Sequence, residues 1–209
     1  MKFLKQIPLA AWLPCALLLL CATACKSDYE SLVEKGLKSG IRNDSLFLGI
    51  HFGMTDKEFY AHCWELNKER LIKQGNTNTS VEYEMSELKS PAQMNFYPTF
   101  HNGAIHEMPV LFNYKAWAPW NRNLWADSLL LDVKILLEQW HGPGFIKMEK
   151  TGKEPRFVKV DGNRRILLWK ENDQYVKALY TDLTKENEMN QRKEETKARA
   201  GRDGAEKGL

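Results

Sequence analysis

The residues best suited to bind a partner are three tryptophans within nine positions of one another. Trp117, Trp120 and Trp125 flank Asn121 and Arg122 in a segment that also contains a proline. A large ring in a connection is harder to bury than one inside a helix or strand. Exposed aromatic faces beside amide and guanidinium donors suit a protein partner or the apolar face of a sugar. The alternative is that all three rings cover the open face of a sheet.

The histidines and cysteines do not form a recognisable catalytic or metal-binding pattern. Five histidines occur, and none stands at the spacing of a zinc-binding helix. His101 and His106 flank a predicted turn, but no cysteine or paired carboxylate completes a zinc site there. His62 and Cys63 are adjacent and point about 100° apart on a helix, so we interpret Cys63 as a small core side chain. The sequence predicts no enzyme, metal or cofactor; an enzyme of unrecognised type is the alternative.

The first 25 residues resemble the export signal of bacterial lipoproteins. Lys2 and Lys5 precede an uncharged apolar stretch that ends in Ala22-Thr23-Ala24-Cys25. This order of cationic, apolar and small residues is typical of a secretory signal peptide. Small residues directly before a cysteine resemble the lipobox, in which the cysteine is acylated and becomes the first residue of the mature chain. The resemblance implies a signal peptide over residues 1–24 and a lipid anchor on Cys25.

Other interpretations of this N-terminus fit less well. A transmembrane anchor needs about 20 uninterrupted apolar residues, and Pro8 and Pro14 interrupt this stretch. Cleavage before Cys21 would place a leucine where a small side chain is favoured. An ordinary signal peptide cut after Ala24 would leave Cys25 as a free or paired thiol. We therefore expect an exported protein of the cell envelope, held by lipid at the outer membrane.

Removal of this leader changes what the composition indicates. The formal charge of +3 includes Lys2 and Lys5, so the mature chain has 28 basic and 27 acidic side chains. A chain with nearly equal numbers of basic and acidic side chains gives no indication of nucleic-acid binding. Only Cys63 then remains besides the acylated cysteine, so no intramolecular disulfide can form. The fold must therefore depend on its apolar core.

The mature chain divides into three parts by composition. Residues 25–42 are polar and predict a tether or a short first helix. Residues 43–183 contain every Trp and Phe of the mature protein and predict one folded domain. Residues 184–209 lack aromatic side chains and are dense in Lys, Arg and Glu. That tail is expected to be a frayed solvated helix or disordered, because it has no apolar face to bury.

The clearest local signal is a helix start near position 55. An apolar, strand-like run over residues 45–52 stops at Gly53, and Thr55 with Glu58 forms a capping box. Apolar residues then recur at helical spacing from Phe59. Gly75 is the expected end of this helix.

Further strands and a second helix follow. Asn102-Gly103 predicts a tight hairpin turn between strands over residues 94–100 and 104–114. The apolar pattern from Leu129 to Trp140 predicts a helix that Gly142-Pro143 ends, and Leu130, Leu131 and Ile135 widen its apolar stripe. Later strands are expected at residues 145–149, 156–160, 164–170 and 175–181.

This order of elements predicts an α+β fold with helices on one face of an antiparallel sheet, built as two rough helix-plus-strands copies. The stretch Phe52-Gly53-Met54-Thr55 with Glu58-Phe59 resembles envelope lipoproteins of the SmpA/OmlA and beta-lactamase-inhibitor-like superfamily. The second copy departs from that pattern because it lacks the Gly-Met-Thr entry. The resemblance implies a role in protein interaction or envelope assembly. A glycan-binding surface lipoprotein is the rival interpretation of the tryptophans.

Overall fold

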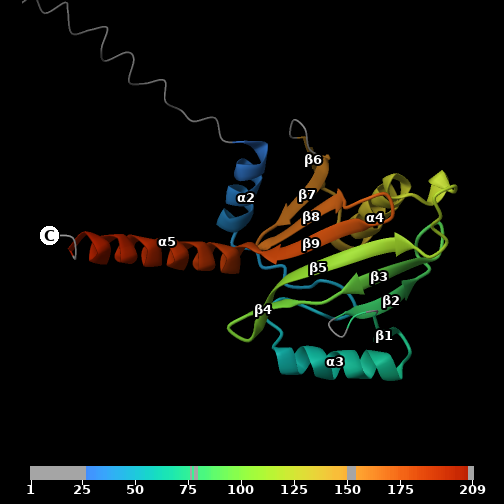
Figure 1. The fold of residues 1–209 in the computed structure, drawn as a ribbon, viewed down its shortest axis with the longest axis horizontal. Helices are drawn as coiled ribbons and strands as arrows, with labels where there is room; N and C mark the ends of the chain where they lie inside the picture. Colours follow the sequence, from blue (N-terminus) through green and yellow to red (C-terminus); the bar gives the residue numbers. More distant parts are fainter. Residues whose placement is uncertain (1–26, 76, 78–79, 150–153, 207–209) are drawn as a thin grey trace, which may run out of the picture.

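Antiparallel strands form one continuous sheet in the part of the chain that the structure describes. The structure is a computed structural model and describes residues 27–75, 77, 80–149 and 154–206. The order across the sheet is β1-β2-β3-β5-β9-β8-β7-β6, and β4 pairs with β5 outside this path (Figure 1). The strands are β1 (Ile72–Gln74), β2 (Val81–Met85), β3 (Ala92–Phe96), β4 (Thr99–His101), β5 (Ala104–Tyr114), β6 (Ile146–Met148), β7 (Arg156–Asp161), β8 (Arg164–Lys170) and β9 (Val176–Asp182).

The sheet has two halves with the same order of elements. The first half is helix α3 (Asp56–Lys68) followed by β1, β2, β3 and β5, with β4 as a short side branch. The second half is helix α4 (Ala126–His141) followed by β6, β7, β8 and β9. The last strands of the two halves, β5 and β9, pair antiparallel at the centre of the sheet. The α+β class is therefore confirmed, and the halves are arranged as the two expected copies.

The main core lies on the face of the sheet that α3 and α4 cover. Cross-strand register places Val110, Phe112, Ala178, Tyr180 and Ile166 on this face, and all are buried. Tyr114 donates a hydrogen bond to Asp132 of α4, and Phe59 of α3 packs against Phe100. The core also takes buried side chains from the connection before α3: Leu46, Phe47, Ile50, Phe52 and Met54.

A β-bulge at His106 keeps both ends of β5 in this core. Phe100 pairs with Ile105 whereas Thr99 pairs with Glu107, so His106 is the extra residue. Ile105 and Met108 are both buried although strict alternation would place them on opposite faces. The bulge shifts the pleat by one residue, which allows β4 to close over the α3 side of the core.

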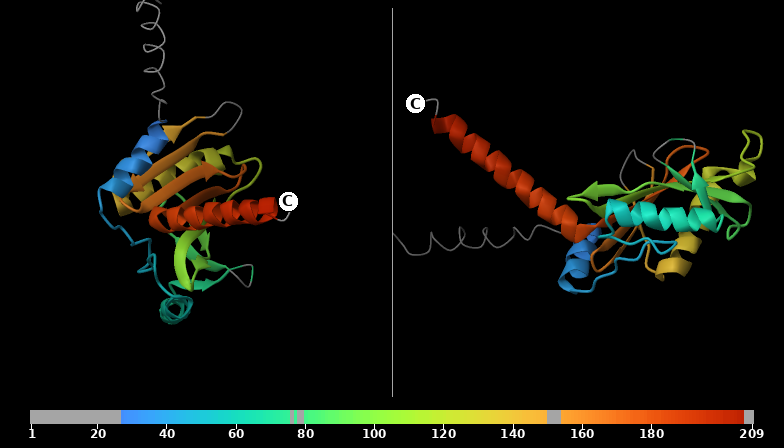
Figure 2. Two further views of the ribbon diagram at one scale, coloured as in Figure 1. Left: turned by 90° about the vertical axis from the view of Figure 1, so that its left-hand side faces the viewer. Right: turned by 90° about the horizontal axis from the view of Figure 1, so that it is seen from below.

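Two further helices flank the sheet. Helix α2 (Asp28–Lys38) starts at a capping box between Ser27 and Glu30 and contacts β7 on the face opposite α3 and α4. The segment expected as a tether or short first helix is thus largely helical. Helix α5 (Leu183–Glu206) continues from β9 and extends away from the sheet (Figures 1 and 2). It occupies most of the charged tail.

Two sequence expectations around α3 are wrong. The apolar run over residues 45–52 is a tight turn rather than a strand: Leu48 and Gly49 both have positive φ, and Leu46 N–H donates to the carbonyl of Ile50. Helix α3 ends at Lys68 rather than at Gly75. Arg70 adopts a positive φ of 61°, and the chain reverses so that Ile72 becomes buried in β1.

One expectation for α4 is also wrong in part. Leu130 is buried, but Leu131 and Ile135 are each 55% exposed. A helix that packs on one sheet face buries one stripe, and these two side chains lie outside that stripe. No helix among the described residues is both long and apolar enough to cross a membrane.

Candidate functional site

The tryptophan segment connects β5 to α4 and exposes one of its three rings. Trp120 is 86% exposed, whereas Trp117 and Trp125 are half-buried. The Trp117 indole donates to the backbone carbonyl of Asp173, and the Trp125 indole donates to the carbonyl of Ala118. The sequence brings the three tryptophans together, but the structure assigns them different roles. Two rings hold the connection in place and one points outward.

The connection around Trp120 is fixed by its own backbone. Asn121 N–H donates to the Ala118 carbonyl, and Leu124 N–H donates to the Asn121 carbonyl in the short 3₁₀ helix η3 (Arg122–Leu124). The Arg122 guanidinium lies 4.9 Å from the centre of the Trp125 ring, a cation–π contact. Arg122 and Asn121 therefore stabilise the loop that presents Trp120.

The sheet face opposite α3 and α4 has a partly exposed apolar centre. Pro109, Leu179 and Leu167 lie directly opposite one another on β5, β9 and β8. The neighbouring row contains Leu111, Lys177 and Trp169, and all these side chains are only partly buried. We call these six residues the open face.

Charged groups surround the aromatic member of the open face. Arg156 and Lys177 lie 5.0 Å and 5.6 Å from the Trp169 ring centre. Glu82 lies on the same face in β2, two strands from Leu111. It is 4% exposed, and its carboxylate accepts a hydrogen bond from Gln93 and pairs with Lys73 at 2.9 Å. Hydrogen bonds to Glu84 and Glu82 raise the pKa of Lys73. The polar side chains beside the open face are thus paired with one another.

Apart from the pair His101 and His106, the histidines lie at separate places in the fold. His62 Nε2 bonds the carbonyl of Leu48, and His141 Nε2 bonds the Tyr180 hydroxyl. His101 and His106 stack edge to face with ring centres 5.7 Å apart. Burial lowers the pKa of His106. Among the described residues, no group of three or more His, Cys, Asp or Glu side chains could hold a metal ion.

Cys63 has the surroundings of a core thiol. It packs against the core from α3, and burial raises its pKa to about 11. A thiol with a raised pKa has little thiolate at neutral pH and is a poor nucleophile. Cys25 lies outside the described residues, as do the signal peptide residues 1–24.

Sequence reasoning missed a second exposed aromatic group on α3. Trp64 is 63% exposed and Tyr60 is 52% exposed. They line a groove of about 420 Å³ between α3 and the β1–β2 edge, together with Val81 and Tyr97. Their i, i+4 spacing on the outer side of an amphipathic helix could have signalled this groove.

The comparisons with known proteins give no further assignment. No family model, curated protein or solved structure matches this chain.

Proposed function

We propose that the chain is a lipid-anchored protein of the cell envelope whose domain binds another protein, with Trp120 as the anchor of the contact. The observation that carries the proposal is one fully presented tryptophan on a loop held by indole and backbone hydrogen bonds. Tryptophan is enriched among the few interface residues that dominate binding energy. A loop fixed before binding loses little conformational entropy when a partner docks.

A protein partner is favoured over a glycan by the number of rings presented. A sugar platform in this segment would need two or more of its tryptophans exposed and roughly coplanar, and Trp117 and Trp125 are half-buried with their indoles already bonded. One protruding ring instead suits insertion into a pocket of a protein partner.

The envelope location and the anchor rest on the leader sequence. A cationic start, an apolar stretch and Ala22-Thr23-Ala24-Cys25 support export followed by acylation of Cys25. More than one acyl chain gives stable membrane attachment. These features support attachment to a membrane of the cell envelope, and the outer membrane is the location that we propose.

Photo-crosslinking in intact cells tests the interaction. A photoreactive residue replaces the exposed Asn123, with Trp120 retained or changed to alanine. A covalent partner should form with Trp120 present, and the purified partner should bind the Trp120→Ala protein at least about 30-fold more weakly, which corresponds to the 2 kcal/mol of a hot-spot residue. Ile135→Ala, at a side chain of α4 that is 55% exposed, is the control and should bind normally.

Thermal unfolding on the same preparations separates recognition from stability. Trp120→Ala should have the same melting temperature as the parent protein, because an exposed ring adds little to the stability of the core. A variant that melts at a much lower temperature would assign Trp120 to structure, and one that binds as well as the parent would contradict its role as the anchor of the contact. The anchor is tested by fatty-acid labelling of Cys25→Ser, which should abolish label and release the protein from membranes. Persistent label would exclude Cys25 as the anchor.

A further inference from the structure

A large hollow lies between helix α2 and the β6–β7 hairpin. It has a volume of about 1020 Å³, which is at the upper end of small-molecule sites. Its apolar lining comes from Tyr29 and Leu32 on α2 and from Ile146 and Met148 on β6. All four side chains are only partly buried, so apolar surface faces the hollow rather than the core.

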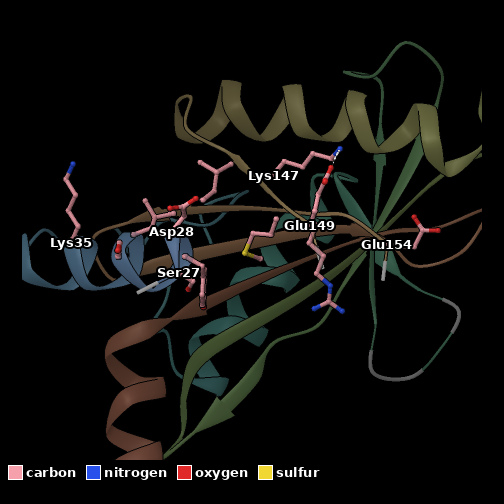
Figure 3. Close-up of a pocket in the computed structure, with 12 residues that line it drawn as sticks. Ser27, Asp28, Lys35, Lys147, Glu149 and Glu154 are labelled. Carbon is pink, nitrogen blue, oxygen red and sulfur yellow. Dashed lines mark ion pairs between the residues drawn. The ribbon is translucent and has the colours of Figure 1, made fainter. Parts of the chain in front are cut away.

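Charged residues surround this apolar lining. Figure 3 shows Asp28 and Lys35 on the α2 side and Lys147, Glu149 and Glu154 on the strand side. Lys147 pairs with Glu149 at 2.5 Å. Because acidic and basic side chains are both present, charge does not select an anion or a cation. The apolar interior therefore defines the ligand class.

Helix α2 forms one wall of the hollow without being packed into it. None of its residues is fully buried. At its C-terminal end, Gly36 approaches β7 so closely that a Cβ atom would lie 2.7 Å from Val160. Near its N-terminal end, the Tyr29 hydroxyl accepts a hydrogen bond from Arg165. These contacts hold the helix at the sheet while the space beside Leu32 stays open.

The position of the hollow in the chain indicates its occupant. Ser27 caps α2 and also lines the hollow, and Cys25 precedes it by two residues. Two extended residues span at most about 7 Å. A group attached to Cys25 is therefore separated by at most about 7 Å of chain from Ser27, which lines the hollow.

We propose that this hollow binds a long-chain acyl group, and that its occupant is an acyl chain carried by Cys25. The inference rests on the proposed lipidation. An acyl chain matches the apolar lining, and its docking would shield it from water whenever the protein is away from the membrane. The hollow would then hold the acyl chain of the anchor while the protein moves between membrane and water.

Binding of a free fatty acid tests the hollow independently of the anchor. The mature-length chain, residues 25–209 with Cys25→Ser, is mixed with a fluorescent 16-carbon fatty acid. We expect saturable binding to one site that unlabelled palmitate displaces. Met148→Asp should weaken binding at least 10-fold, and Leu131→Asp, at an exposed leucine of α4, should leave it unchanged. Absence of saturable binding, or equal affinity of both variants, would overturn the proposal.

A photoreactive fatty acid locates the site even if Met148→Asp fails to fold. In the Cys25→Ser chain without a further substitution, label should fall on residues 27–35, 146–149 and 154–156, and label confined to other segments would overturn the proposal. The lipidated wild-type protein, kept free of membranes, should not take up the added probe, because its own chain fills the hollow. Uptake by protein whose Cys25 acylation is verified would overturn Cys25 as the source. If fatty-acid labelling of cells shows no acyl group on Cys25, the anchor fails and with it this occupant, whatever the free probe does.

Discussion

Arg165 and Glu186 form a two-pronged ion pair that joins strand β8 to the first turns of α5. One guanidinium nitrogen of Arg165 donates to Glu186 Oε2 at 2.9 Å and the other donates to Oε1 at 2.8 Å. The same guanidinium also donates to the hydroxyls of Tyr29 in α2 and Thr181 in β9. Arg165 thus connects helices α2 and α5 to the sheet.

Loss of the Glu186 carboxylate should destabilise the domain. Glu186→Gln leaves a guanidinium that is 10% exposed without its counter-charge. Breaking a fully buried pair costs about 3–5 kcal/mol and an exposed one at most about 1 kcal/mol, so for this half-buried pair we expect about 2 kcal/mol. The urea midpoint measures the change. Glu188→Gln, in a surface pair with Lys185, is the control and should have little effect; equal midpoints for both variants would show that α5 is not held by this pair.

The stability of the domain should fall between pH 6.5 and pH 4 because of His141. Burial, with Arg164 and Lys159 nearby, lowers its pKa to about 4, and Asp161 opposes this only in part. As the pH falls through 6.5, the unfolded chain takes up a proton at His141 that the folded domain does not. Stability is thus lost as the pH falls, until the folded state also protonates near pH 4.

Unfolding at several pH values measures this contribution. His141→Gln should flatten the dependence over that window, and His51→Gln, at an exposed histidine, should retain it. An unchanged slope in His141→Gln would assign the pH dependence to other groups.

The tight hairpin was predictable because its signal is local. Asn102 and Gly103 have φ of 51° and 75°, the left-handed conformation that a two-residue turn requires and that these residue types favour. The turn at Leu48-Gly49 needs the same conformation, but Leu48 gives no local signal for it. Its neighbours form an apolar run like that of a buried strand, whereas in the structure Phe47 and Ile50 are buried in the core on either side of a turn.

The sequence indicates which segment carries the three tryptophans but not which of the rings is exposed. Three clustered tryptophans indicated a special segment, yet which ring is exposed depends on distant chain. Trp117 is held by the carbonyl of Asp173, which lies 56 positions away. The hollow beside α2 was not predictable, since it depends on how closely Gly36 approaches β7. Neither contact can be predicted from the spacing of residues along the chain.

Thr55→Ala should lower the free energy of unfolding by about 1 kcal/mol, the usual effect of a lost N-cap. The Thr55 hydroxyl accepts from Glu58 N–H at 3.2 Å, and Glu58 accepts from Thr55 N–H at 2.8 Å. Thr55→Ser keeps the hydroxyl and should recover most of the loss. Partner binding through Trp120 should not change in the folded variant. An unchanged denaturation midpoint and slope for Thr55→Ala would mean that α3 does not depend on this cap.

Gly162→Ala should be far more damaging than the same change at another turn glycine. Gly162 has a φ of 57°, and a Cβ atom there would lie 2.0 Å from the carbonyl oxygen of Ile41. Gly103 has a φ of 75° with no atom within 4 Å of that position. Backbone strain alone costs about 1–2 kcal/mol, which we expect for Gly103→Ala.

At Gly162 the backbone of residue 41 must also move, and with it the chain that leads into the core at Leu46. We therefore expect Gly162→Ala to lower the free energy of unfolding by more than about 4 kcal/mol, or to prevent folding. Thermal unfolding of the two variants measures the difference. Equal losses would show that the β7–β8 turn does not pack against the segment that follows α2.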